Sequence, residues 1–178
     1  MGGASRRMGH DKAQQDWNGR SAVDRVFDLA FEAGVEVALA VGRDIPGRTS
    51  VVDGGGGPVG GVVLAARYLH EAGCARALIL AVDAPTLTAQ DLTPLLRSPT
   101  GAAFQGQHLP MVLPIAAIPM DAEAGWPMGR LAERAGLARP PCDPVTLPRV
   151  RGANTPDERA ALLAELVRRE GAHRGDTE

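Results

Sequence analysis

Aromatic residues are scarce in this chain, which has three phenylalanines, two tryptophans and one tyrosine among its 178 residues. Hydrophobic residues nevertheless make up 44% of the sequence, so its core must consist mainly of alanine, valine and leucine. Such small aliphatic side chains are typical of helices packed closely on a sheet and argue against an aromatic-rich binding module. The length suits one globular domain with a sizeable core.

Cysteines and long apolar runs are also rare. The two cysteines, Cys74 and Cys142, are too few and too far apart for a disulfide framework or a cysteine-based metal site, and we expect ordinary thiols in a reducing cytoplasm. No run approaches the roughly 18 apolar residues that span a bilayer. The polar first 20 residues do not resemble a signal peptide. We therefore expect a cytoplasmic protein with no membrane partner.

Cationic charge is not concentrated anywhere along the chain. The formal net charge is −2, from 19 cationic and 21 acidic residues, and no basic run is longer than a pair such as Arg6-Arg7. A protein that binds nucleic acid normally carries a basic face. The sequence therefore predicts no nucleic-acid partner.

Lysine is rarer still, because Lys12 is the only one and every other long cationic side chain is arginine. It ends the segment 2–12, Gly-Gly-Ala-Ser-Arg-Arg-Met-Gly-His-Asp-Lys. Glycine lets backbone amides approach an anion, and lysine binds phosphate as a compact point charge. The segment predicts a triphosphate-binding loop, although it is not a Walker loop. The alternative is a flexible N-terminal tail that contains a lysine by chance.

Hydrophobic patterns alternate between strands and helices along most of the chain, which predicts an α/β sandwich with a largely parallel central sheet. The predicted domain covers residues 1–169, and residues 170–178 are predicted to be a disordered tail. Predicted strands are 35–41, 51–53, 77–82, 101–105 and 110–117. Predicted helices are 22–33, a helix from the glycine cluster 54–61 to about residue 72, one that starts at Thr88, 128–135 and 156–169.

Two aspartates follow predicted strands, Asp53 and Asp83. The carboxyl ends of parallel strands meet at one edge of a sheet, so we expect both to lie near Lys12. A carboxylate there suits a magnesium ion that bridges phosphate oxygens, and Asp83, followed by Ala84-Pro85, is the better candidate. The alternatives are a cap or turn role for Asp83 and a simple Asp-Gly turn for Asp53.

Five segments resemble, in the same order, motifs of the molybdenum cofactor guanylyltransferase family (MobA-like NTP transferases). The first is the most specific, since that family carries Leu-Ala-Gly-Gly-x-Ser-x-Arg-Met-Gly-x-Asp-Lys. The resemblance spans residues 2 to about 165. The segments are 2–13, Val52-Asp53 with Gly-Pro-Val-Gly-Gly at 57–61, Val-Asp-Ala-Pro at 82–85, Gly-Gln-His-Leu-Pro-Met at 106–111, and Asn-Thr-Pro-Asp-Glu at 154–158.

This resemblance implies a Rossmann-like three-layer nucleotidyltransferase that moves GMP from GTP to the terminal phosphate of molybdopterin and releases pyrophosphate. It implies Mg²⁺ as cofactor, held by Asp83, and catalytic roles for Lys12 and Asp83. Molybdoenzymes or molybdenum-insertion proteins would be partners of a monomer or weak oligomer. The nucleotide-binding residues it implies are Gly2, Gly3, one of Arg6 and Arg7 (assigned as Arg7), Lys12, Asp53, Gly57, Pro58, Gly61 and Asp83.

The chain departs from the family pattern in two respects. In the family pattern a buried first strand ends in Leu-Ala at the position where this sequence has Met1. We therefore expect that this strand is missing from the sequence. Adding upstream residues should then raise the melting temperature by several degrees. Gly152 replaces the first asparagine of Asn-x-Asn-Thr-Pro, and Ala40 or Gly42 replaces an asparagine after the second strand. Both losses weaken the expectation of polar contacts with nucleotide or metal.

Other functions remain open at this stage. A molybdopterin cytidylyltransferase is the nearest alternative, but Gly2-Gly3 and the 57–61 segment favour guanine. A sugar-1-phosphate or cobinamide nucleotidyltransferase would need a longer acceptor region. A non-catalytic GTP-binding relative would bind nucleotide without magnesium-dependent turnover.

Overall fold

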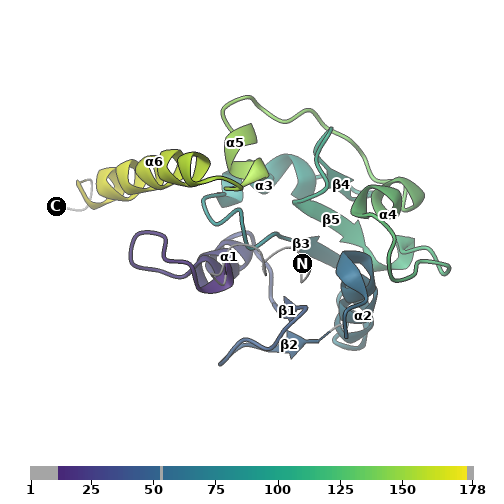
Figure 1. Cartoon of the computed structure of the whole chain (residues 1–178). Helices are drawn as coiled ribbons and strands as arrows, with labels where there is room; N and C mark the ends of the chain where they lie inside the picture. The colour runs from purple at the N-terminus through teal and green to yellow at the C-terminus, as the bar shows by residue number, and fades with distance from the viewer. Residues whose placement is uncertain (1–11, 53, 176–178) are drawn as a thin grey trace.

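The computed structural model of the chain describes residues 12–52 and 54–175, which form a layered arrangement of helices and short strands (Figure 1). No helix in these two stretches is long and apolar enough to cross a bilayer. The elements are η2 (Lys12–Gln14), α1 (Ala22–Glu32), β1 (Ala40–Val41), β2 (Ser50–Val51), α2 (Gly57–Glu71), β3 (Arg76–Ile79), α3 (Ala89–Leu96), β4 (Ala102–Ala103), β5 (Met111–Pro114), η3 (Ile115–Ala117), α4 (Met128–Arg134), α5 (Leu147–Arg151) and α6 (Pro156–Gly175).

The predicted helices are confirmed, and local capping explains where several of them begin. The Ser21 hydroxyl accepts a hydrogen bond from the Asp24 amide at 3.2 Å at the start of α1. At the start of α3, Thr88 and Asp91 form a capping box, with N–O distances of 2.9 and 3.2 Å. Such contacts satisfy amides that the first helical turn leaves without partners.

The strands form two small sheets, and this corrects the prediction of one largely parallel sheet. β1 and β2 are parallel, whereas β5 lies between β3 and β4 and is antiparallel to both. The chain reverses direction after β4 around Gly106, so β5 returns alongside its neighbour. The strands are also shorter than predicted, because a strand extends only as far as its pairing ladder.

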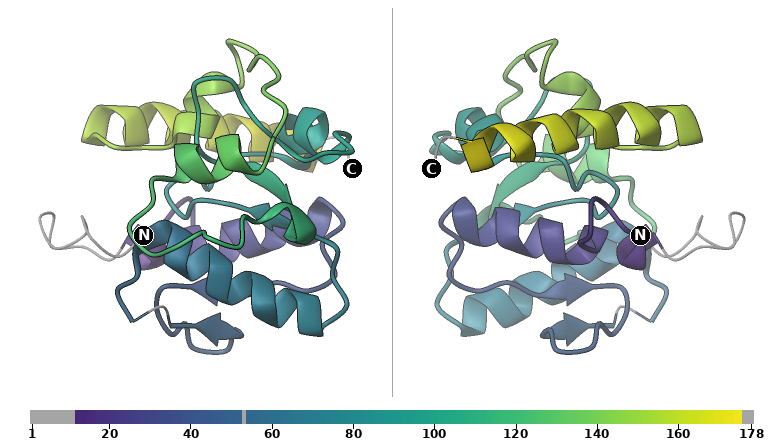
Figure 2. Two further views of the ribbon diagram at one scale, coloured as in Figure 1. Left: turned by 90° about the vertical axis from the view of Figure 1, so that its right-hand side faces the viewer. Right: turned by 90° about the vertical axis from the view of Figure 1, so that its left-hand side faces the viewer.

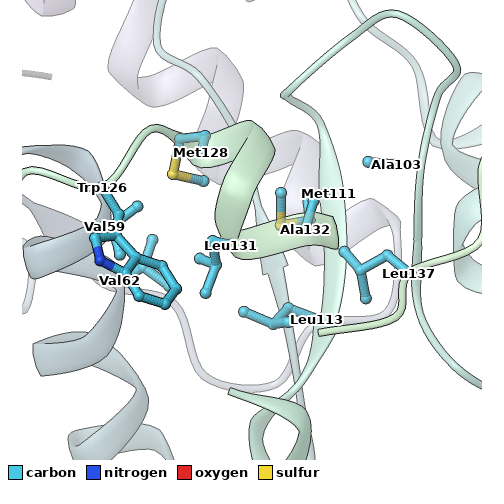
Figure 3. Close-up of a cluster of buried hydrophobic side chains, with 10 residues drawn as sticks. All are labelled: Val59, Val62, Ala103, Met111, Leu113, Trp126, Met128, Leu131, Ala132 and Leu137. Atoms are coloured by element: carbon cyan, nitrogen blue, oxygen red, sulfur yellow. The ribbon is translucent and has the colours of Figure 1, made fainter. Parts of the chain in front are cut away.

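Alternating side chains of β5 contribute to two hydrophobic cores on opposite faces, as expected for a strand buried on both sides. Met111 and Leu113 belong to a cluster with residues of α2 and α4, whereas Val112 belongs to a cluster with residues of α1 and α3. Figure 2 shows α1 and α2 on opposite sides of the strands, which confirms the α/β class. Figure 3 shows the first cluster, namely Val59, Val62, Ala103, Met111, Leu113, Trp126, Met128, Leu131, Ala132 and Leu137.

Helix α6 is longer than predicted, because it continues to Gly175. The expectation of a disordered tail is therefore wrong for residues 170–175, while 176–178 lie outside the described residues. Leu162 and Leu166 pack against Trp17, which is 1% exposed. Beyond them, Glu170 accepts a hydrogen bond from Arg25 at 2.7 Å. These contacts with the N-terminal part of the chain are tertiary, so a local pattern does not reveal them.

Candidate active site

The structure brings together two of the predicted site residues, Lys12 and Asp83. The Lys12 Nζ lies 3.5 Å from the Asp83 Oδ2, although 71 positions separate the two residues in sequence. Both side chains remain accessible, at 35% and 23% exposure. A cation and a carboxylate are thus held side by side where a phosphate or a metal ion can reach them.

Lys12 is placed by the residues that follow it. Ala13 is 4% exposed and packs with Val23 and Phe27 of α1, and Val82 lies against the same cluster. The Ala22 amide donates to the Gln15 carbonyl at 2.9 Å, which joins the short η2 turn to the start of α1. The cluster therefore anchors the backbone next to Lys12 beside the chain that leads to Asp83.

Asp83 lies in a turn a few residues beyond the end of β3. The Ala84 amide donates to the Ala81 carbonyl at 3.2 Å, and Ala84, 2% exposed, packs into the cluster shared by α1 and α3. The Asp83 carbonyl accepts a hydrogen bond from the Ala153 amide at 3.1 Å. The backbone of Asp83 is therefore held on both sides, while its carboxylate stays accessible.

Gly57 and Pro58, predicted to bind nucleotide, lie in the first turn of α2, which follows β2. The N-cap Gly56 makes no side-chain hydrogen bond, and proline in this turn is typical of a helix start. The N-terminus of such a helix attracts anions through its amides and its dipole. Gly61, by contrast, is buried one turn further along the helix.

The remaining predicted site residues, Gly2, Gly3, Arg7 and Asp53, lie outside the described residues. In the sequence, Gly152 stands out only as the loss of an asparagine. The structure places Gly152 directly against the peptide that follows Asp83. No local signal in the sequence marks this contact, since it joins two loops far apart along the chain.

The carboxylate of Asp83 fits a magnesium ion that is bound together with a nucleotide. Within residues 12–52 and 54–175, no three metal-ligating side chains gather into a site that would hold a metal by themselves. Mg²⁺ usually keeps several water ligands and takes one or two carboxylates together with substrate phosphates. One accessible carboxylate beside a lysine suits that type of binding.

A lysine and a carboxylate that meet beyond the end of a strand in a layered α/β fold suit a protein that binds phosphate groups. The family model described as the MobA-like NTP transferase domain matches residues 1–125. The chain therefore belongs to the MobA-like NTP transferase family.

Two relatives support this assignment. The molybdenum cofactor guanylyltransferase of Xanthomonas euvesicatoria pv. vesicatoria (strain 85-10) is 31% identical over 176 residues, which cover 92% of this chain and 92% of that protein. The probable molybdenum cofactor guanylyltransferase of Opitutus terrae (strain DSM 11246 / JCM 15787 / PB90-1) is 35% identical over 134 residues, which cover 69% of this chain and 65% of that protein.

Proposed function

We propose that this protein is a nucleotidyltransferase that moves GMP from GTP to the terminal phosphate of molybdopterin. The similarity to a guanylyltransferase of nearly the same extent supports the reaction. The observation that carries the site is the Lys12–Asp83 pair, because it joins the end of the first motif to the turn that follows β3. Molybdoenzymes or molybdenum-insertion proteins would receive the product.

In this reaction an oxygen of the molybdopterin phosphate attacks the α-phosphorus of GTP. The new phosphoanhydride bond forms as the bond to the β-phosphate breaks, and pyrophosphate leaves with that electron pair. The attacking phosphate is already ionised, so no general base is required. The main barrier is the repulsion between two anions, which positioning and charge neutralisation lower.

The two paired residues can divide this task. Lys12 would neutralise the triphosphate as a point charge. Asp83 would hold Mg²⁺, which when bound would neutralise phosphate oxygens. Their direct contact is long, at 3.5 Å, and both side chains are accessible, so a phosphate or a metal ion can compete for them.

The α2 N-terminus would serve the nucleotide as a second group of donors. Its glycine and proline residues leave room for a flat base or a phosphate to approach the backbone. The resemblance to the family's Gly-Pro segment supports a place near guanine for Gly57 and Pro58.

The test measures pyrophosphate release with molybdopterin, Mg²⁺ and either GTP or CTP. We expect GTP-dependent release that falls by about 10²-fold or more in Lys12→Ala and in Asp83→Ala. Asp28→Ala is the matched control, because it removes a carboxylate paired with Arg20 on the surface of α1. Release with CTP alone would make the protein a cytidylyltransferase. Absence of release with either nucleotide would favour a non-catalytic GTP-binding relative.

A further inference from the structure

The turn that joins α5 to α6 lies directly on the peptide that follows Asp83. Gly152 ends α5 with φ +64°, and a Cβ at this position would come within 2.8 Å of the Asp83 carbonyl carbon and 3.2 Å of the Ala84 amide nitrogen. The next residue, Ala153, donates its amide to the Asp83 carbonyl at 3.1 Å. Only a residue without a side chain fits this approach.

Both ends of this turn are fixed by polar contacts. On the α5 side, Arg149 donates to both carboxylate oxygens of Asp91 on α3, at 2.9 and 2.6 Å. On the α6 side, Thr155 and Glu158 form a capping box, with N–O distances of 3.0 and 3.2 Å. Ala153 itself packs against the cluster that contains Trp17 and Leu162. The turn therefore presents a firm surface to Asp83.

The sheet does not provide this support by itself. The pairing of β3 with β5 ends at Ile79, so its ladder of hydrogen bonds stops before Asp83. The contact with residues 152–153 holds the Asp83 backbone from one side, and the Asp83 carboxylate reaches Lys12. A shift of this turn would move the carboxylate away from its position beside the lysine.

We propose that the Gly152–Ala153 turn is a positioning element that fixes the Asp83 carboxylate for metal-dependent nucleotide binding. The inference rests on the proposed function, since it assigns Asp83 to the metal. The turn touches the backbone of Asp83 and not the reacting atoms. Residues that orient a metal ligand in this way typically affect metal affinity by about 10- to 100-fold.

The test compares Gly152→Ala with Gly136→Ala. Gly136 has nearly the same backbone angle, φ +66°, but a Cβ there would meet no atom within 4 Å. Both substitutions therefore strain a left-handed residue, and only the first presses on Asp83. Calorimetric titration with GTP, in Mg²⁺ and in EDTA, measures how much the metal tightens nucleotide binding.

We expect Mg²⁺ to tighten GTP binding in the parent protein and in Gly136→Ala. In Gly152→Ala this gain should fall by at least about tenfold, while the affinity for GTP in EDTA stays unchanged. If Gly152→Ala does not fold, Ala153→Pro takes its place, because proline lacks the amide that bonds the Asp83 carbonyl.

An equal gain in Gly152→Ala and Gly136→Ala, or no gain in the parent protein, would overturn the inference. A gain in the parent protein without GMP transfer to molybdopterin would instead refute the proposed function. The two failures can therefore be told apart.

Discussion

The pairing of Arg149 with Asp91 should contribute more to the stability of this protein than any exposed ion pair. Each residue is 8% exposed, and the guanidinium makes two hydrogen bonds to the carboxylate, at 2.9 and 2.6 Å, and a third to Glu165 at 2.7 Å. In Arg149→Met the carboxylate of Asp91 would remain buried without its cation. Breaking a buried pair in this way costs about 3–5 kcal/mol, out of a total of about 5–15 kcal/mol for a typical domain.

The pH dependence of this loss of stability tests whether the buried charge of Asp91 causes it. Burial by itself would raise the pKa of Asp91, but the hydrogen bonds from Arg149 and from the Thr88 backbone outweigh it and hold the pKa below its ordinary value of 3.8. In the parent protein this carboxylate therefore stabilises the fold above about pH 4, and the stabilisation is lost as the pH falls through the lowered folded-state pKa. In Arg149→Met the guanidinium is gone but the burial remains, and it raises the pKa of Asp91. The difference in unfolding free energy between the two proteins should therefore shrink as the pH falls toward 4.

Urea denaturation at 25 °C, followed from pH 7 to pH 4, measures both effects. Arg134→Met is the control, because it removes a cation from an exposed pair with Asp121, whose side chains are 49% and 59% exposed, and should cost less than about 1 kcal/mol. Adding Asp91→Asn to Arg149→Met should recover part of the loss. A loss for Arg149→Met below about 1 kcal/mol, or one that does not change with pH, would refute the reasoning.

Two further predictions concern a core residue and a thiol. Leu131→Ala should lower the free energy of unfolding by about 2–5 kcal/mol, since Leu131 of α4 is fully buried against α2 and β5. A loss below about 1 kcal/mol in urea denaturation would contradict this packing. Burial and the neighbouring charges of Asp143 and Asp91 raise the pKa of the Cys142 thiol, which donates to the Asp143 carbonyl. In a Cys74→Ser background, Ellman's reagent at pH 8 should therefore react more slowly with the folded protein than with the urea-unfolded chain, and equal rates would count against the raised pKa.

Helix positions were predictable because the signals that start and stop helices are local. Ser21, Thr88 and Thr155 each accept a hydrogen bond from an amide three residues further on, and such pairs can be recognised in a sequence. The meeting of Lys12 with Asp83 was predictable for a different reason, because ligands of α/β proteins gather beyond strand ends.

The antiparallel direction of β5 was missed because pairing direction depends on which strands become neighbours. A segment such as Met111–Pro114 has the same apolar pattern whether it runs parallel or antiparallel to β3. The buried role of Arg149 was missed because its partner Asp91 lies 58 positions away. The same holds for Gly152, which the family pattern marks only as a substitution.

The shared position of β5 also determines how the protein should lose its structure. Met111 and Leu113 support the layer that contains α2 and α4, while Val112 supports the layer that contains α1 and α3. If one layer separates, this strand loses its packing on one face, and the support that it gives to the other layer weakens. The two helical layers are therefore expected to melt together as one cooperative unit.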